Sequence, residues 1–232
     1  MKCFDDRQLL CKNGVLMAYA GTKEGVTGMR DTDDKRMLRL VNRKHTLSGD
    51  FIPDGLAFAK DYGVNAARPD IRLHRRACKA MATLMEHAAA QGAGRLVLFS
   101  GYRSFAEQKK LHENKIIRLC RQGRPIPRAR EEACAVVAPP GASEHQLGLA
   151  ADVTVPEYLC RKDPLIESFA DTVQGKWLLS HAYAFGFILR YPADKEEHTG
   201  VCYEPWHLRY VGEIDARRIF LGRMCLEEYL YQ

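Results

Sequence analysis

Apolar residues recur at helical spacing in several parts of the chain. Between residues 71 and 90 they fall three or four positions apart, which predicts a long helix that ends before two closely spaced glycines. A second helix is expected after Ser104, because serine is a frequent N-cap residue. Its inward face would consist of Phe105, Gln108, Leu111, His112, Ile116 and Leu119. Further helices are predicted over residues 173–183 and 214–230.

Other segments have the pattern of strands. Residues 96–99 form a short apolar run, as a central strand does. Residues 147–155 alternate, so Leu149 and Val153 share one side of a strand and Asp152 lies on the side opposite the core. Additional strands are expected at residues 15–20, 38–41, 187–191 and 206–211. Because helices and strands do not alternate regularly, the order favours the α+β class over a doubly wound parallel sheet.

The domain organisation is expected to be simple. The 232 residues contain no internal repeat, no low-complexity tract and no Pro/Gly/Ser-rich linker. We therefore expect an N-terminal extension over residues 1–37 and a single domain over residues 38–232. Hydrophobic residues make up 46% of the chain and charged residues 28%, which is the composition of a folded globular protein. No apolar run approaches the ~18 residues of a transmembrane helix.

The net charge of +6 would suit an anionic partner such as cell-wall polymer, nucleic acid or lipid headgroups, but it is also an ordinary charge for a soluble protein. Five arginines gather between residues 118 and 130, together with Pro125 and Pro127 and without interleaved aromatic residues. The stretch is therefore expected to be a solvated loop, and no nucleic-acid partner is predicted.

The chain has eight cysteines, and no two are spaced as C-x-x-C, which argues against a zinc ribbon or a thioredoxin motif. Cys78 and Cys120 fall on apolar faces of predicted helices, where a reduced cysteine packs as a small hydrophobe. Most thiols are expected to be free, with one or two disulfides left open for a protein outside the cell. Acidic residues interrupt the first ten positions, which is not the pattern of a secretory signal.

Two short segments carry the candidate chemistry, SEHQLGLAAD at residues 143–152 and EPWH at residues 204–207. A loop histidine, His145, and a strand carboxylate, Asp152, can converge on one point, and Glu204 and His207 add a second pair. Two imidazoles and one carboxylate could bind a metal ion while the other carboxylate acts as a base, which is the donor set of a mononuclear zinc hydrolase.

Two other interpretations of these residues are weaker. Ser143, His145 and Asp152 could suggest a serine hydrolase, but residues two apart rarely face each other productively and no G-x-S-x-G elbow surrounds the serine. The remaining histidines are expected to be surface or satisfied core residues. They are His45, His74, His87, His112, His181 and His198. His198 differs in that it lies in the turn before Glu204.

Four motifs occur in a fixed order: SGYRSFAEQ (100–108), SEHQLGLAAD (143–152), GFILRYP (186–192) and EPWHLRYVG (204–212). Together they resemble the VanY-type D-alanyl-D-alanine carboxypeptidases of the M15 metallopeptidase family, relatives of the VanX dipeptidases and the LdcB L,D-carboxypeptidases. LVNRKHTL near residue 40 resembles the usual start of the family domain, so the resemblance covers roughly residues 38–215. It implies a small antiparallel sheet flanked by helices, with a zinc site on the sheet face.

The resemblance also implies roles for single residues. His145, Asp152 and His207 would bind Zn²⁺. Glu204 would be the catalytic base, and Arg103 would stabilise the oxyanion of the intermediate. The residues implied to contact the substrate are Gln108, Ser143, Tyr191 and Trp206. The chain departs from the family pattern at His198, where an aliphatic residue is common, and in its cysteine count and N-terminal extension.

The sequence therefore predicts a zinc carboxypeptidase that releases terminal D-alanine from peptidoglycan stem peptides. We expect it to act as a monomer in the cell envelope or outside the cell, with a cytoplasmic location as the alternative. An L,D-carboxypeptidase or a D-Ala-D-Ala dipeptidase would use the same metal site. A module that binds cell wall without cutting it is the alternative of another class, and intact Glu204 and Arg103 argue against it.

Overall fold

The computed structural model describes residues 36–231, and its centre is a four-stranded sheet in the order β3-β4-β6-β5. All three strand pairs are antiparallel. The strands are β3 (Val97–Ser100), β4 (Ala150–Thr154), β5 (Phe187–Leu189) and β6 (His207–Tyr210). A separate two-stranded sheet pairs β1 (Leu56–Phe58) with β2 (Arg72–His74). The predicted α+β class and small antiparallel sheet are thus confirmed.

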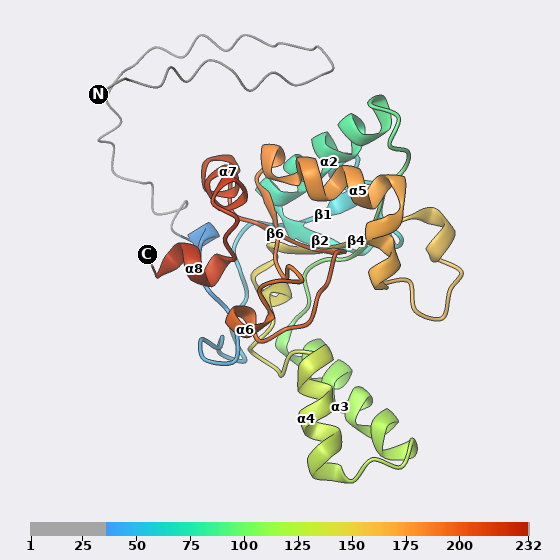
Figure 1. The fold of residues 1–232 in the computed structure, drawn as a ribbon, viewed down its shortest axis with the longest axis vertical. Helices are drawn as coiled ribbons and strands as arrows, with labels where there is room; N and C mark the ends of the chain where they lie inside the picture. Colours follow the sequence, from blue (N-terminus) through green and yellow to red (C-terminus); the bar gives the residue numbers. More distant parts are fainter. Residues whose placement is uncertain (1–35, 232) are drawn as a thin grey trace, which may run out of the picture. The chain divides into compact units, whose positions relative to one another are not determined.

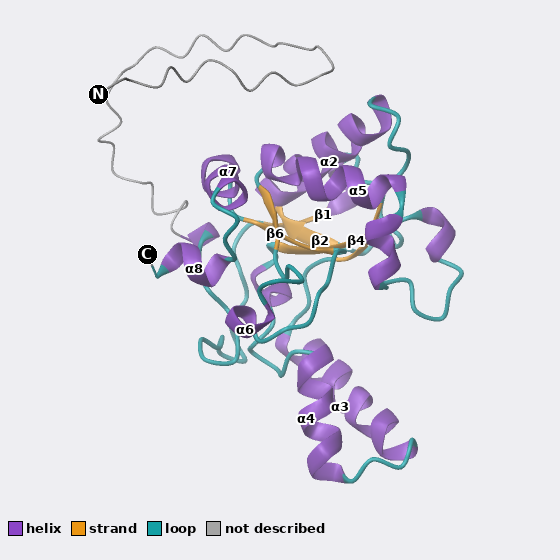
Figure 2. Cartoon of the chain, viewed as in Figure 1, coloured by secondary structure: helices purple, strands orange, loops and turns teal. Residues whose placement is uncertain are grey.

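Helices cover one face of the sheet, and the other face carries the loops that form the candidate site (Figures 1 and 2). The helices are α2 (Arg75–Ala90), α3 (Phe105–Arg121), α4 (Ile126–Val136), α5 (Val173–His181), α6 (Glu196–Thr199), α7 (Glu213–Leu221) and α8 (Leu226–Leu230). Helices α2 and α5 lie together on the covered face, whereas α6 and the α3–α4 hairpin lie on the opposite side. Within residues 36–231, no helix has the length and apolar character needed to cross a bilayer.

The main core lies between α2, α5 and the covered face of the sheet. Helix α2 buries a stripe at helical spacing, as predicted. The buried residues of the stripe are Ala77, Cys78, Met81, Leu84, Met85 and Ala88. They join Leu98, Ala151 and Leu208 from three strands in one hydrophobic cluster. The helix begins at Arg75 and not near residue 71, because residues 72–74 pair with β1 instead.

Cysteines in the described residues are all free thiols, in line with the expectation for most of them. Cys78 is fully buried on α2, and burial raises the pKa of its thiol to about 11, so it packs as an unreactive hydrophobe. Cys120 is only partly buried. Cys3, Cys11 and the strand expected at residues 15–20 lie outside the described residues.

Helix α3 begins directly after Ser104, as predicted, and this serine forms a capping box with Glu107. The Glu107 backbone N–H donates to Ser104 Oγ, and Glu107 Oε2 accepts from the Ser104 backbone N–H. The basic stretch that follows was expected to be a loop, and this was wrong, because most of it is helical. Helix α3 continues to Arg121, and α4 begins directly after Pro125. Both prolines are tolerated there because the first helical turn needs no backbone N–H donors.

The predicted C-terminal helix over residues 214–230 is two helices. A turn between α7 and α8 separates them, and Arg223 in this turn has a left-handed φ of 51°. The expected strand at residues 38–41 is absent as well: this segment is a turn and extended coil.

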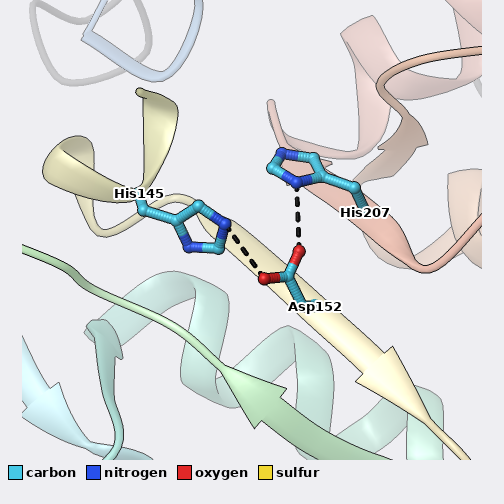
Figure 3. Close-up of side chains that lie close together, drawn as sticks. All are labelled: His145, Asp152 and His207. Atoms are coloured by element: carbon cyan, nitrogen blue, oxygen red, sulfur yellow. Dashed lines mark ion pairs between the residues drawn. The ribbon is translucent and has the colours of Figure 1, made fainter. Parts of the chain in front are cut away.

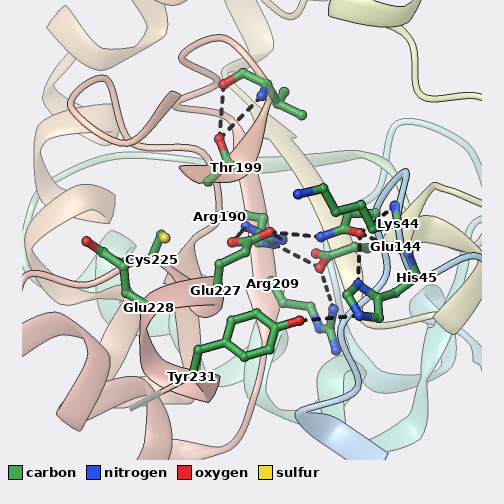
Figure 4. A network of polar contacts seen from close by, with 12 residues as sticks. Lys44, His45, Glu144, Arg190, Thr199, Arg209, Cys225, Glu227, Glu228 and Tyr231 are labelled. Carbon is green, nitrogen blue, oxygen red and sulfur yellow. Dashed lines mark hydrogen bonds and ion pairs between the residues drawn. The ribbon is translucent and has the colours of Figure 1, made fainter. Parts of the chain in front are cut away.

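A cluster of four buried charges connects these segments (Figure 4). Arg190 donates from Nε to Glu144 Oε1 (2.8 Å) and makes two parallel hydrogen bonds to Glu227 (2.8 and 2.6 Å). Arg209 Nη1 lies 2.7 Å from Glu144 Oε1. All four residues are buried, so each charge depends on its partners and not on water. We call these residues, Glu144, Arg190, Arg209 and Glu227, the charge cluster.

Arg209 also binds the backbone at the start of the segment that was expected to be a strand. Its Nη2 donates to the backbone carbonyls of Met37 and Arg39, both at 2.9 Å. These carbonyls are therefore bound to a buried guanidinium and are not paired with another strand. The first described segment of the chain is held against the sheet by this arginine.

Replacing Arg190 with methionine should lower the free energy of unfolding by about 3–5 kcal/mol, because the carboxylates of Glu144 and Glu227 would stay buried with fewer partners. Urea unfolding at pH 7 measures this loss. Arg218→Met is the matched control, because Arg218 is 56% exposed and lies 3.7 Å from Asp215, so about 0–1 kcal/mol is expected. Equal losses in the two variants would contradict the role of the charge cluster.

The same measurement should depend on pH. Burial alone would raise the pKa of Glu144, but the charges of Arg190 and Arg209 lower it to about 2. A lowered carboxyl pKa stabilises the fold above the ordinary value of 4.5, and this contribution is lost as the pH falls toward about 2. The difference between wild type and Arg190→Met should therefore shrink in acid.

Candidate metal centre

Three buried side chains meet on the open face of the sheet, His145, Asp152 and His207 (Figure 3). Asp152 lies on β4 and His207 begins β6, and the two residues are directly opposite in the strand pairing. His145 comes from a short 3-10 helix, Glu144–Leu147, that leads into β4. One ligand atom from each residue lies within 4.8 Å of the others. The structure thus brings together the three residues predicted as metal ligands.

Backbone contacts fix the orientation of His145. Its Nδ1 is 2.6 Å from the carbonyl oxygen of Gly101, so Nδ1–H donates and the Nε2 lone pair faces Asp152 Oδ2 at 3.1 Å. The backbone N–H of Arg103 donates to the His145 carbonyl at 3.1 Å. Gly101 follows an irregularity in the β3–β4 pairing, and a Cβ there would collide with the Arg72 carbonyl. Only glycine therefore lets the chain at this position pass so close to the backbone of β2.

The donor set fits a metal ion. Asp152 Oδ1 makes no hydrogen bond although His207 Nδ1 is 3.0 Å away, which is expected where both atoms are directed at a common ion. Burial and the charge of Arg103 lower the pKa of His145, whereas burial alone would lower the pKa of His207 but the negative charge of Asp152 raises it. Burial would raise the pKa of Asp152, but the two histidines hold it well below its usual range. Two imidazoles and an ionised carboxylate are a set that zinc accepts.

Glu204 and Arg103, the predicted catalytic residues, lie beside this group. Glu204 Oε2 is 3.6 Å from His207 Nδ1. Burial raises the pKa of Glu204 to about 7, helped by the negative charge of Asp152 and opposed by His207 and Arg103. A carboxyl group with a pKa near neutrality can both accept and release a proton at physiological pH. Arg103 Nη2 lies 3.7 Å from Asp152 Oδ2.

Gln108 is placed differently from the other predicted substrate contacts, because its polar atoms already have protein partners. Its Oε1 accepts from Arg103 Nη1 at 2.9 Å, and its Nε2 donates to the Ala138 carbonyl at 2.7 Å. It therefore holds the Arg103 guanidinium in place from the first turns of α3. The side chain is buried.

Ser143, Tyr191 and Trp206 line a cavity of about 430 Å³ that also contains the three candidate ligands. The Tyr191 ring lies 4.8 Å from the His207 ring, measured between centroids. His198 is not among the residues that line this cavity: its side chain is 53% exposed and lies 3.6 Å from Glu228. His198, where the chain departs from the family pattern, thus lies outside the cavity of the candidate site.

Sequence analysis did not single out the charge cluster, although three of its four members lie near a site residue in the sequence. Glu144 directly precedes His145, Arg190 precedes Tyr191, and Arg209 follows His207 by two positions. A possible signal was available, because Arg190 and Arg209 interrupt otherwise apolar strand segments. A charge at such a position is buried only when an opposite charge meets it.

Comparisons with known proteins agree on one family. The family model described as VanY, D-alanyl-D-alanine carboxypeptidase, matches residues 70–213. The chain is 35% identical over 198 residues to the putative carboxypeptidase YodJ of Bacillus subtilis, which covers 84% of this chain and 67% of that protein. It is 41% identical over 193 residues to a D-alanyl-D-alanine carboxypeptidase of Enterococcus faecalis, covering 83% and 65%. The chain thus spans about two thirds of the length of these relatives.

Solved structures give the same result. The LdcB LD-carboxypeptidase, studied for its recognition of peptidoglycan, superposes with a TM-score of 0.73 at 34% identity, covering 90% of this chain and 92% of that one. A variant of the vancomycin-resistance D,D-pentapeptidase VanY in complex with Zn(II) gives 0.69 at 34% identity, covering 84% and 99%. VanYB in complex with D-alanine-D-alanine gives 0.70 at 34% identity, covering 84% and 98%.

His145→Ala and His207→Ala should each bind far less zinc than wild type, because each removes one of three converging donors. Metal analysis after dialysis against a weak chelator measures the zinc content per chain, with one equivalent expected for wild type. His198→Ala serves as the control, since this exposed histidine lies outside the cavity. Full zinc content in both ligand variants would show that the metal is bound elsewhere.

Proposed function

Because the chain belongs to the VanY family of D-alanyl-D-alanine carboxypeptidases, we propose that it is a zinc-dependent D,D-carboxypeptidase that releases terminal D-alanine from peptidoglycan stem peptides. The observation that supports this most directly is the convergence of two histidines and an aspartate on one point beside a carboxyl group of raised pKa. The candidate zinc ligands are His145, Asp152 and His207.

Glu204 is the proposed proton carrier. A bound zinc ion supplies a Lewis acid and lowers the pKa of water to about 7. Glu204 accepts the proton of the attacking water and later delivers it to the nitrogen of the departing D-alanine. Burial favours this role because a carboxyl group with a pKa of about 7 holds its proton only loosely at neutral pH.

Arg103 is the proposed partner of the oxyanion that develops at the scissile carbonyl. Its guanidinium has a fixed position because Gln108 accepts from Nη1 at 2.9 Å and Asp152 lies 3.7 Å from Nη2. Donors that are fixed before the reaction stabilise developing charge most effectively. Ser143, Tyr191 and Trp206 form the adjoining wall and are proposed to orient the peptide.

An L,D-carboxypeptidase is the second candidate, because the structure superposes on the LdcB LD-carboxypeptidase with a TM-score of 0.73. Mass analysis of defined stem peptides separates the possibilities. Conversion of a pentapeptide to a tetrapeptide indicates D,D-activity, and conversion of a tetrapeptide to a tripeptide indicates L,D-activity. Cleavage of free D-Ala-D-Ala would indicate a dipeptidase, and no cleavage of any substrate by the zinc-loaded protein would favour a binding module.

We also propose that the protein acts as a monomer in the cell envelope, and that residues 38–232 form the carboxypeptidase domain while residues 1–37 are an extension. The polymer substrate supports the location, and the origin of all candidate site residues in one chain supports the monomer. Light scattering during size-exclusion chromatography, cell fractionation and turnover by a protein that lacks residues 1–35 test these points.

Glu204→Gln should retain the fold and one zinc per chain but lose turnover by about 10²- to 10⁴-fold, because the amide cannot accept the proton. Release of D-alanine from a pentapeptide stem, together with zinc analysis, measures both effects. Glu157→Gln makes the same change at an exposed position and should behave as wild type. Near wild-type turnover by the Glu204 variant would assign proton transfer to another group.

Arg103→Ala should lower kcat far more than it raises KM, by an amount equivalent to about 3 kcal/mol, because the lost donor acts mainly on the transition state. Arg103→Lys should not restore the full rate, since an ammonium lacks the planar fork of donors. Arg95→Ala, at an exposed position, is the control. An unchanged kcat with a raised KM would mean that Arg103 binds the substrate in its ground state only.

A further inference from the structure

One face of α3 lines the active-site cavity from the candidate metal centre outward. Gln108, Leu111, Lys115 and Arg118 all line this cavity, and their spacing of three, four and three residues places them on one side of the helix. The inner end of this face holds Arg103 through Gln108. The outer end carries two cations, Lys115 and Arg118, so the wall of the cavity that α3 forms becomes positively charged toward its outer end.

These two cations have no carboxylate partner within 4.0 Å among residues 36–231. The nearby Glu132 is engaged by Arg124 and Arg128, at 3.2 and 2.8 Å. Asp163 also lines the cavity, and its Oδ1 accepts from the Leu165 backbone N–H at 3.3 Å. Burial and the positive charge of Arg118 lower the pKa of Lys115, and the negative charges of Asp163 and Glu132 oppose this shift without reversing it. The two cations therefore still repel each other, and an anion bound between them would relieve that repulsion.

The distance of the two cations from Gln108 indicates which part of the peptide substrate can contact them. Lys115 and Arg118 follow Gln108 by seven and ten residues, so they lie about 10 and 15 Å further along the helix at ~1.5 Å per residue. A carboxypeptidase releases a single residue, so only the part of the peptide before the scissile bond can reach that far. An extended chain advances ~3.4 Å per residue, which corresponds to about three or four residues before the bond.

We propose that Lys115 and Arg118 form a subsite for a free carboxylate about three residues before the scissile bond of the stem peptide. A γ-linked glutamyl residue at that position carries such a group, because the linkage leaves its α-carboxylate free. The inference rests on the proposed carboxypeptidase activity and adds to it a preference between stem peptides. Amidation of that carboxylate removes the charge and hence the preference.

The test compares two lysine-containing pentapeptide stems that differ only in a free or an amidated α-carboxylate on the γ-linked D-glutamyl residue. The wild-type zinc enzyme should favour the free carboxylate by about 5- to 10-fold in kcat/KM, mainly through KM, as expected for one charge-assisted contact. Lys115→Gln/Arg118→Gln should reduce this preference to less than about 2-fold, and glutamine preserves helix propensity. Lys110→Gln/Arg121→Gln removes two charges from exposed positions of α3 outside the cavity and should keep the wild-type preference.

A short acylated D-Ala-D-Ala substrate separates this inference from the proposed function. Both double variants of α3, Lys115→Gln/Arg118→Gln and Lys110→Gln/Arg121→Gln, should cleave it at the wild-type rate, because it cannot reach the subsite. Its failure to react with the wild-type protein would contradict the carboxypeptidase activity itself. Calorimetry measures the affinity of the two pentapeptides for zinc-loaded Glu204→Gln protein, in which turnover is suppressed. The same measurement is made on Glu204→Gln protein that also carries Lys115→Gln/Arg118→Gln. An equal affinity for both peptides, or a preference that survives in the Lys115/Arg118 variant, overturns the subsite.

Discussion

The charge cluster is the interaction on which the candidate site depends. Two arginines and two glutamates are removed from water, and only their mutual contacts make this burial tolerable. Glu144 is the residue before His145, Arg190 precedes Tyr191, and Arg209 lies two residues after His207. The same ion pairs that balance the charges therefore position the segments that carry the site. Glu227 extends this connection to α8 at the end of the chain.

The sheet adds a second constraint, because antiparallel pairing determines which residues can meet. Asp152 and His207 are separated by more than fifty positions in the sequence, yet they lie opposite each other on β4 and β6. His145 then needs only the short 3-10 helix before β4 to reach the same point. Two of the three donors thus depend on strand register, and a shift by one residue would turn Asp152 toward the hydrophobic core.

Local signals in the sequence were sufficient to predict most of the helices and strands. The apolar stripe of α2 and the cap at Ser104 act within one helix, and both appear in the structure as predicted. Long-range contacts were not accessible to such reasoning. Residues 38–41 have the apolar pattern of a strand, but the carbonyl of Arg39 in this segment accepts from Arg209, which is 170 residues away. Helix α4 was missed because two prolines resemble a loop when their place in the first turn is unknown.

The separation of the candidate ligands along the chain has a consequence for folding. An unfolded polypeptide does not hold His145, Asp152 and His207 together, so zinc would bind the native state almost alone. By linkage, each tenfold increase in free zinc above its dissociation constant would then add about 1.4 kcal/mol to the stability of the native state. The availability of the ion would thus decide how long the polypeptide survives proteolysis, in addition to whether it can turn over a substrate.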